Sequence, residues 1–190
     1  MKKPLVDRWR AADGSWLHMR LMQPRDAPLV KESLNRLSPK SRRNRFFAPI
    51  TEFSDEAVRQ LVDVDPQNVY ALVVTHLERG TPVPIAGGRL VEQPGDGECS
   101  FSLLVGDRWQ GQRIGRRLLK ALLREASRRG LRQISGEVLV DNQPMLRLAR
   151  SLHFVVTGDR SEGVLQVVRD VPPPSSRRIA GLLRKVLRRR

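Results

Sequence analysis

The sequence predicts an α/β (α+β) fold, in which a mixed, mostly antiparallel central sheet of about six to seven strands carries helices on both faces. Segments that alternate apolar and polar residues are interspersed with segments of helical periodicity along the chain. Three strands in the middle of the chain have connections short enough for antiparallel pairing. The strand–helix–strand of residues 100–140 needs a crossover, so it contains a locally parallel pair.

The expected strands are short runs in which apolar residues alternate or cluster between turn residues. In chain order they span residues 16–21, 70–76, 83–91, 100–105, 134–140, 154–157 and 164–168. Glycine and proline mark the turns between the middle three, at Gly80–Pro84 and Pro94–Gly97. These short turns favour hairpin-like connections there.

The expected helices share apolar residues at intervals of three and four. In chain order they span residues 26–37, a short segment capped by Ser54, residues 111–129 and residues 142–152. The third is the clearest, because Ile114, Leu118 and Leu122 lie on one stripe. Gly130 follows it at the C-terminal position that favours glycine.

Composition and charge restrict the class of protein. The chain has 35 Lys+Arg and 20 Asp+Glu, a formal net charge of +15, and 39% hydrophobic residues. The longest apolar runs, such as Val69–Val74, fall far short of the ~20 residues needed to span a bilayer. No apolar stretch typical of a secretory signal follows the N-terminus. The single cysteine, Cys99, excludes an intramolecular disulfide and a multi-cysteine metal site. We therefore expect a cytoplasmic protein without a metal centre.

Much of the charge lies at the C-terminal end. Residues 171–190 begin with a Pro-rich linker, contain no acid, and carry apolar residues at helical spacing between basic ones. We expect a domain over residues 1–170 followed by this basic amphipathic tail. Such a tail fits an anionic membrane surface or an acidic partner, and it also fits packing onto the domain or onto a second copy in a homodimer. No aromatic residue interleaves its charges, which disfavours nucleic acid.

Residues 103–117 (LLVGDRWQGQRIGRR) combine an apolar strand, a glycine-containing loop and the start of a long helix. Gly111 and Gly115 allow a close approach to the backbone, and Arg113, Arg116 and Arg117 crowd the first turn. Unpaired N–H groups at a helix N-terminus suit a phosphate or pyrophosphate. The residues alone leave two interpretations open, phosphate binding or an ordinary glycine turn.

The loop resembles the acetyl-CoA loop of the GNAT family of N-acetyltransferases, whose pattern is Q/R-x-x-G-x-G/A. Gln110 takes the first place and Gly115 the last, while Arg113 stands at the middle glycine. We expect a helical φ at Arg113, which would tolerate the side chain. Residues 136–154 resemble the next strand and helix of the family. LHMRLMQPRDAPLV and the loop LSPKSRRNRFFAPI (Leu37–Ile50) are similar to the GNAT domain of bacterial protein-lysine acetyltransferases.

The resemblance implies a GNAT-like sheet and acetyl-CoA as the acyl donor. It places acetyl-CoA in a notch between the strand that ends at Val105 and the strand that ends near Val140. The implied cofactor-binding residues are Leu103, Leu104 and Val105 for the pantetheine arm, and Gln112, Arg113, Ile114, Gly115 and Arg116 for the pyrophosphate. Gln110 and Gly111 in the loop and Asn142 at the start of the next helix complete the implied set. Asp107, just before the loop, is expected to organise the turn.

The resemblance also exposes a departure at the catalytic position. Protein-acetylating relatives carry a glutamate on the fourth strand, and Ser100 occupies that place here. Glu98, two residues earlier and so on the same strand face, is the expected substitute base, with an exposed turn residue as the alternative. Glu137 is a second carboxylate candidate, with a structural salt bridge as its alternative. Ala149 stands where many relatives have a tyrosine that protonates the leaving thiolate.

The sequence therefore predicts an acetyl-CoA-dependent N-acetyltransferase that acts directly on a primary amine, with a protein lysine as one acceptor. The alternative is a catalytically weak, acetyl-CoA-binding sensor or adaptor module of the same fold. Arg42, Arg43 and Arg45 in the loop after residue 37 either contact an acceptor or are solvated.

Overall fold

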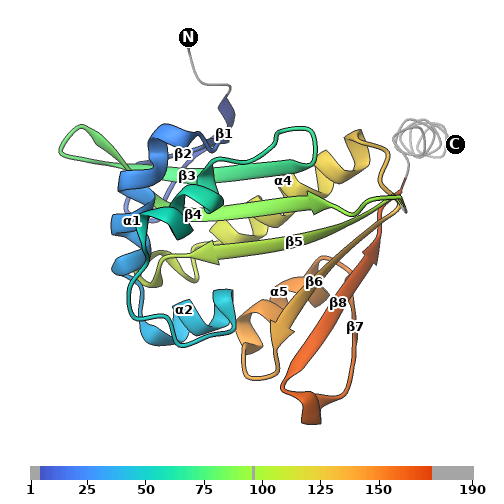
Figure 1. Cartoon of the computed structure of the whole chain (residues 1–190). Helices are drawn as coiled ribbons and strands as arrows, with labels where there is room; N and C mark the ends of the chain where they lie inside the picture. The colour runs from blue at the N-terminus through green and yellow to red at the C-terminus, as the bar shows by residue number, and fades with distance from the viewer. Residues whose placement is uncertain (1–4, 96, 173–190) are drawn as a thin grey trace, which may run out of the picture.

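The computed structural model describes residues 5–95 and 97–172, which form one eight-stranded sheet and its helices (Figure 1). The strands are β1 (Leu5–Arg10), β2 (Trp16–Leu21), β3 (Val69–Glu78), β4 (Thr81–Glu92), β5 (Glu98–Val105), β6 (Gln133–Leu139), β7 (Val155–Thr157) and β8 (Val164–Asp170). The helices are α1 (Ala27–Asn35), α2 (Pro39–Phe46), α3 (Asp55–Val62), α4 (Ile114–Arg128) and α5 (Gln143–Ser151), with single 3₁₀ turns at Pro24–Asp26, Asp107–Trp109 and Arg160–Glu162.

The sheet confirms the predicted fold class. Its order is β1-β2-β3-β4-β5-β6-β8-β7, and every neighbouring pair is antiparallel except β5 and β6, which are parallel. The parallel pair is the one that the crossover through α4 requires. The strand count exceeds the expectation by β1, an edge strand in which Trp9 alone is buried.

Helix α2 corrects the expectation of a loop over residues 37–50. Its sequence, PKSRRNRF, has no apolar stripe, so periodicity does not reveal it. Its start is nevertheless marked, because the Ser38 side chain accepts a hydrogen bond from the Ser41 N–H and Pro39 follows at the first helical position. Phe47, in a left-handed conformation, ends the helix.

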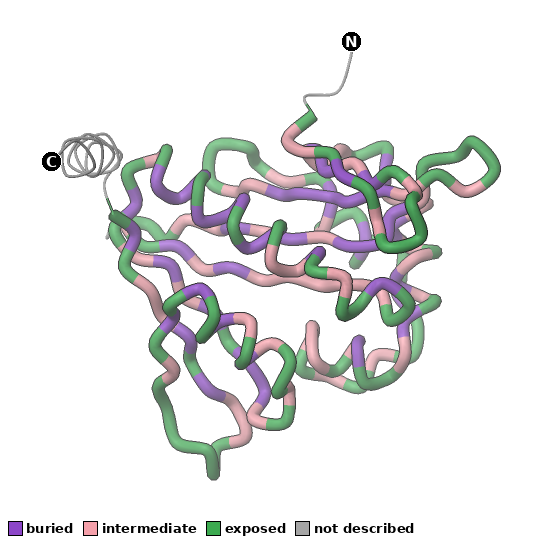
Figure 2. The backbone as a smooth tube through the Cα atoms, turned by 180° about the vertical axis from the view of Figure 1, so that it is seen from behind, coloured by how far each residue is buried: buried purple, intermediate pink, exposed green. Residues whose placement is uncertain are grey.

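Two apolar layers cover the two faces of the sheet. On one face α4 and α5 contribute Leu118, Leu122 and Leu146 to the main core. On the other face α1 and α3 contribute a smaller cluster that includes Leu34 and Val58. Figure 1 shows α1 and α2 in front of the sheet and α4 behind it, and in Figure 2 buried residues run along the central strands and the core side of α4.

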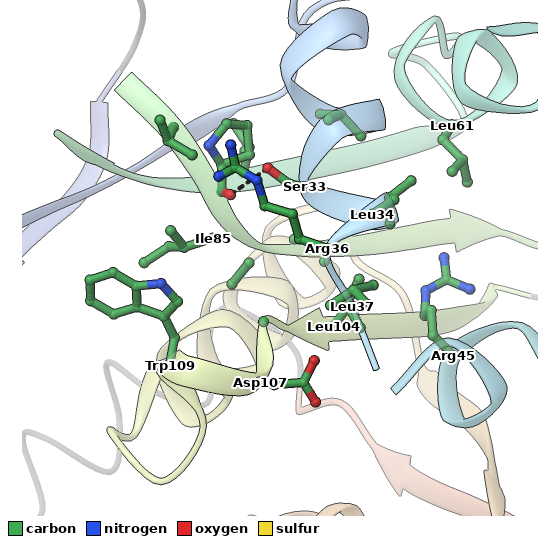
Figure 3. Close-up of a pocket in the computed structure, with 18 of the residues that line it drawn as sticks. Ser33, Leu34, Arg36, Leu37, Arg45, Leu61, Ile85, Leu104, Asp107 and Trp109 are labelled. Carbon is green, nitrogen blue, oxygen red and sulfur yellow. Dashed lines mark hydrogen bonds between the residues drawn. The ribbon is translucent and has the colours of Figure 1, made fainter. Parts of the chain in front are cut away.

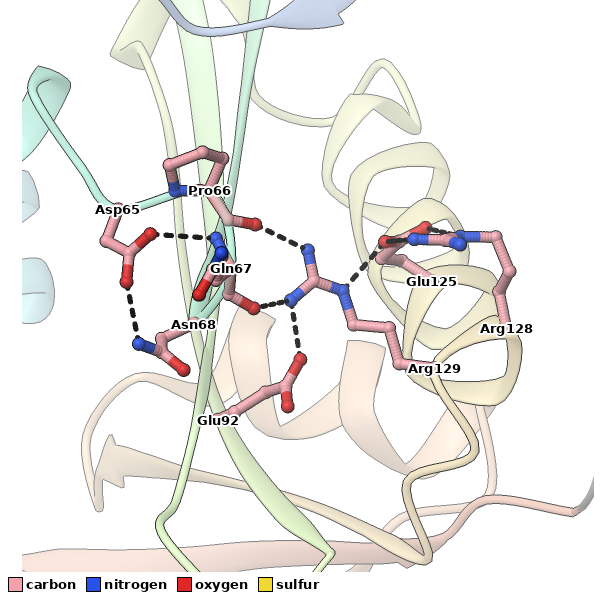
Figure 4. Close-up of polar contacts among 8 residues, drawn as sticks. All are labelled: Asp65, Pro66, Gln67, Asn68, Glu92, Glu125, Arg128 and Arg129. Carbon is pink, nitrogen blue, oxygen red and sulfur yellow. Dashed lines mark hydrogen bonds and ion pairs between the residues drawn. The ribbon is translucent and has the colours of Figure 1, made fainter.

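A polar network fixes the C-terminal end of α4 to the sheet (Figure 4). Arg129 donates to Glu125 on α4 at 2.8 Å, to Glu92 on β4 at 2.5 Å, and to the carbonyl oxygens of Pro66 and Gln67 at 3.2 and 2.6 Å. Both Arg129 and Glu125 are nearly buried, at 13% and 9% side-chain exposure. Arg128 also pairs with Glu125, but its side chain is 70% exposed.

No helix in the described ranges is both long and apolar enough to cross a bilayer. Within the same ranges no cluster of three His, Cys, Asp or Glu side chains offers a metal site. The predicted tail, residues 171–190, lies outside the described residues except for Val171 and Pro172.

Replacing Arg129 should destabilise the fold far more than replacing Arg128. Arg129→Met leaves the Glu125 and Glu92 carboxylates without their buried partner, and we expect a loss of about 3 kcal/mol in the free energy of unfolding. Arg128→Met removes an exposed pair to the same Glu125, which water and salt screen, so we expect a much smaller loss. Urea unfolding of both variants measures the difference, and equal losses would contradict this assignment.

Candidate functional site

The parallel strands β5 and β6 stay paired over only three residues. Their register runs from Glu98–Gln133 to Ser100–Ser135, and no pairing follows. At that point the strands diverge (Figure 1) and border a cavity of about 890 Å³, which we call the notch. A β-carbon at Gly136 would lie 2.7 Å from the Phe101 ring, so glycine is needed there for Phe101 to fit at the point of divergence.

The notch gathers nearly all the site residues predicted from the sequence. Its lining includes Ser100, Leu103, Leu104, Val105, Gln110, Gly111, Arg113, Ile114, Gly115, Arg116 and Asn142. Glu98 and Gln112 do not belong to the lining. The Gln112 side chain instead donates to the Arg108 carbonyl oxygen at 3.3 Å.

The backbone of β5 offers hydrogen-bonding groups to the notch. The Gly106 N–H donates to the Ile85 carbonyl oxygen on the β4 side. Because antiparallel pairing alternates along a strand, the N–H and C=O groups of Leu103 and Val105 point the other way, into the notch. The Gln110 side-chain amide occupies the Val105 oxygen at 3.1 Å. Leu104 contributes its side chain rather than its backbone, because its backbone groups face β4.

The loop before α4 has an unusual backbone. Gly111 and Arg113 have φ of +76° and +62°, so the expected helical φ at Arg113 is wrong. A left-handed conformation suits glycine, which the GNAT pattern has there, and costs a side chain roughly 1–2 kcal/mol. The first helical bond runs from the Arg117 N–H to the Arg113 oxygen at 3.2 Å. The preceding N–H groups, up to Arg116, therefore have no partner within the helix.

The start of α4 packs tightly beside the notch. A β-carbon at Gly115 would lie 3.3 Å from Leu148 on α5, so glycine allows the two helices to approach. Arg116 donates to the Ser151 hydroxyl at 2.7 Å, which ties α4 to the end of α5. Asn142 caps α5 by accepting from the Met145 N–H at 3.3 Å. The loop and both helix starts thus form one wall of the notch, with Arg113 and Arg116 as basic residues on it.

Asp107 links this loop to α2, as the expected organiser of the turn. Its carboxylate accepts from the Ser38 N–H at 2.9 Å and from the hydroxyls of Ser38 and Ser41 at 2.7 Å each. Burial opposes its ionisation, but these hydrogen bonds outweigh that effect and hold the pKa of Asp107 below its usual range. Ser41 also accepts from Gln110 at 3.2 Å. Helix α2 is therefore anchored directly to the loop.

The two candidate carboxylates occupy different places. Glu98 shares the face of Ser100 and Ser102, as the alternation predicts, but it is exposed and lies at the first residue of β5. Glu137, on β6, lines the notch, and its Oε1 accepts from the Gln166 side chain at 3.2 Å. Ser100 also lines the notch. Sequence reasoning ranked Glu98 higher because register alone does not show where the strands part.

The structure explains the positions of three further residues, Cys99, Ala149 and His153, by packing or backbone conformation. Cys99 is buried, which raises the pKa of its thiol to about 12, and its Sγ lies 3.4 Å from the Gln133 oxygen. Ala149, at the tyrosine position, is fully buried. His153 has φ of +61° just after α5, where the family has glycine. Cys99 and Ala149 therefore supply neither a nucleophile nor a proton donor to the notch.

A second cavity, of about 380 Å³, lies between the sheet and helices α1, α2 and α3; we call it the helix-side cavity (Figure 3). It is mainly apolar, with Leu34, Leu37 and Leu104 among its walls. The side chains that line both this cavity and the notch are Arg45, Ser102, Leu104, Asp107 and Trp109. The two cavities therefore meet across the far half of β5.

The three arginines of α2 have separate roles. Arg42 donates to backbone oxygens of Asn35, Ile50 and Thr51 and is structural. Arg43 forms an exposed 2.7 Å ion pair with Asp141, after β6. Arg45 points into the helix-side cavity (Figure 3). Arg89 on β4 also lines this cavity. Nothing in the sequence around it predicts this role.

Arg113→Gly should change stability and donor affinity in opposite directions. Glycine relieves the left-handed strain, so we expect the free energy of unfolding to rise by about 1 kcal/mol. It also removes a positive charge from the notch, so acetyl-CoA, the donor implied by the resemblance, should bind several-fold more weakly. Urea unfolding and calorimetric titration measure the two effects. A variant that is less stable, or that binds as tightly as wild type, would contradict the assignment.

Asp107→Asn should have a pH-dependent cost. We expect a loss of about 1 kcal/mol at pH 7, modest because Asp107 is exposed. Its pKa is lowered in the folded state, so its stabilisation is present above the unfolded pKa of about 3.9 and disappears as pH falls through the folded value. Unfolding free energies of wild type and variant should converge below about pH 4. A constant gap down to pH 2.5 would show that the charge is not responsible.

Comparison with known proteins agrees with this geometry. The family model for the Acetyltransferase (GNAT) family matches residues 35–154. Acetyltransferase PA5475 of Pseudomonas aeruginosa is 30% identical over 151 residues, which cover 78% of this chain and 81% of that protein. Acetyltransferase Pat of Mycolicibacterium smegmatis is 28% identical over 161 residues, 84% of this chain but only 47% of that relative.

A solved structure shows the same fold. The GNAT domain of S. lividans PAT superposes with a TM-score of 0.76 at 23% identity, covering 86% of this chain and 96% of that domain. Because the family model matches most of the chain and a relative is 30% identical, the chain belongs to the GNAT acetyltransferase family and is an acetyl-CoA-dependent N-acetyltransferase.

Proposed function

We propose that the chain transfers the acetyl group directly to a primary amine that reaches the notch from the helix-side cavity. The observation that carries this proposal is the wall shared by the two cavities, formed by Arg45, Ser102 and Leu104. A donor in the notch and an acceptor in the helix-side cavity would meet there. The resemblance to bacterial protein-lysine acetyltransferases supports a protein lysine as one acceptor to test.

Acetyl-CoA supplies an activated thioester, and the protein holds it. The residues that would hold the pantetheine arm are Leu103 and Val105, through backbone groups. The N–H groups from Gln112 to Arg116 would receive the pyrophosphate. The neutral amine nitrogen then bonds to the thioester carbonyl carbon and gives up one of its two protons to water. The carbon–sulfur bond breaks, and the CoA thiolate takes a proton from water, which leaves the amide and free CoA. An amine with a pKa near 10.4 must first lose its proton, so a base assists.

We propose Glu137 as that base, because it lines the notch and Glu98 does not. Ser100, which also lines the notch, would hold a water between the amine and the carboxylate, since a serine hydroxyl is not itself a base. The sequence-based assignment of Glu98 stays a prediction, and the two carboxylates can be separated by experiment.

Glu137→Gln should lower kcat by about 100-fold, the usual scale for loss of a general base. Glu98→Gln is the matched control, a conservative change of an exposed carboxylate on the same sheet face, and should leave kcat nearly unchanged. Both are measured by release of free CoA thiol with amine and acetyl-CoA saturating. The reverse pattern would restore Glu98 as the base.

A second candidate is a catalytically weak module that binds acetyl-CoA as a sensor or adaptor. Ser100 at the glutamate position and Ala149 at the tyrosine position favour it. The discriminating result is saturable acetyl-CoA binding without acetylation of any amine, lysine peptides included.

The tail remains a separate proposal. Residues 171–190 would dock the domain on an anionic membrane surface, an acidic partner or a second copy of the chain, with the domain in the cytoplasm. Their basic and apolar spacing in the sequence supports this.

A further inference from the structure

Four arginines line the helix-side cavity. Arg36 pairs with Glu32, and Arg108 is exposed and lies over the Trp109 ring. The other two, Arg45 and Arg89, reach the cavity from different elements. Arg45 extends from α2 towards Leu61 on α3 (Figure 3), and Arg89 lies on β4 opposite Ser102 of β5. Paired residues of antiparallel strands share a sheet face, so Arg89 and Ser102 face the same cavity. Arg45 and Ser102 also line the notch. Both cations therefore lie beside the place where donor and acceptor would meet.

Neither guanidinium is neutralised within residues 5–95 and 97–172. No ion pair or hydrogen bond joins either one to the described protein, and the Arg89 Nε is buried with no partner. The two acids on the cavity wall, Glu78 and Asp107, do not pair with them, and Asp107 is held by serines. Burial, and then the nearby charge of Arg89, lower the pKa of Arg45 to about 10, and burial lowers the pKa of Arg89.

Other buried arginines of this fold are neutralised. Arg20 pairs with Asp26 at 2.6 Å, and Arg129 pairs with Glu92 and Glu125. An unpaired charge in a partly desolvated cavity is costly, and two like charges together are more so. A planar guanidinium binds carboxylate or phosphate through two parallel hydrogen bonds. The pair is therefore arranged to receive an anion.

We infer that the acceptor is a small primary amine that also carries a carboxylate or phosphate group, bound with its anion against Arg45 and Arg89. This inference rests on the proposed acetyl transfer between the two cavities. A cavity of about 380 Å³ lies in the range of small-molecule sites. Its apolar walls, which include Leu34, Leu37 and Leu61, fit a hydrocarbon body between or beside the two polar groups.

The same features disfavour a lysine side chain of a protein. A lysine brings a positive charge and no anion to a cavity whose wall already carries Arg45 and Arg89, both without a carboxylate partner among the described residues. Helix α2 also borders the cavity, and it is held in place because Asp107 anchors its start and the Arg43–Asp141 ion pair joins it to the segment after β6. A small molecule that carries both an amine and an acid group enters such a space more readily than a lysine on a folded protein does.

The inference is tested with matched acceptors. Leucine, leucinamide and isoamylamine share a hydrocarbon body, and only leucine has the carboxylate; O-phosphoethanolamine and ethanolamine form the phosphate pair. For each anionic amine we expect kcat/KM to be at least tenfold higher than for its analogue without the anionic group. The pair with the larger ratio identifies carboxylate or phosphate. Equal values within both pairs, or a lysine peptide as the best acceptor, would overturn the inference.

Arg89→Gln should remove the preference. We expect kcat/KM for the anionic amine to fall at least tenfold and its ratio to kcat/KM for the analogue without the anion to approach one, while the affinity for acetyl-CoA stays unchanged. Arg59→Gln is the control, because Arg59 lies exposed on α3 and pairs with Glu56 at 3.0 Å. Thermal unfolding checks the fold; without ligand, Arg89→Gln should be at least as stable as wild type, since a like-charge contact is lost. A preference that survives Arg89→Gln contradicts the assignment.

The outcomes also separate the two levels of the proposal. If acetyl-CoA binds but no amine of the panel and no lysine peptide is acetylated, the proposed transfer itself fails. If amines are acetylated without regard to an anionic group, the transfer stands and only the inference about the acceptor fails.

Discussion

The point at which β5 and β6 stop pairing determines the rest of the site. Up to Ser100 and Ser135 the strands share hydrogen bonds, and beyond them the Phe101 ring, packed on Phe154 with ring centres 5.4 Å apart, lies against Gly136. The divergence turns backbone groups of β5 towards the notch instead of a neighbouring strand. It also places the notch beside the C-terminal half of β5, where Ser102 and Leu104 line the helix-side cavity as well. A single local break in the sheet thus opens the notch, the proposed donor site, beside the helix-side cavity, the proposed acceptor site.

Charge is distributed to match this geometry. The basic loop before α4 faces the notch where a pyrophosphate would bind, and Asp107 uses its negative charge to hold α2 rather than to take part in chemistry. Elsewhere the buried arginines, such as Arg129 at the far end of α4, are neutralised by carboxylates. Arg45 and Arg89 are the contrast, and they lie where a substrate rather than the fold would supply the counter-charge.

The sequence predicts those parts that local patterns encode. Periodicity is enough for α4 and for the middle strands, and the short turns and the crossover give their pairing directions. Alternation correctly places Glu98, Ser100 and Ser102 on one face. The sequence does not predict helix α2, because that helix has no apolar stripe. It does not predict the left-handed φ of Arg113 either, because an arginine gives no sign of that conformation. Glu137 lines the notch because β5 and β6 pair over only three residues, and Arg89 faces the cavity because of the register between β4 and β5. No local sequence pattern predicts either of these features.

We expect acetyl-CoA to bind where β5 and β6 diverge. A crystal structure of the protein with CoA tests it most directly. We expect the pantetheine arm between the two strands, hydrogen-bonded to backbone groups of Leu103 and Val105, with the pyrophosphate at the N–H groups of residues 112–116. CoA bound in the helix-side cavity, or elsewhere with β5 and β6 untouched, would contradict it.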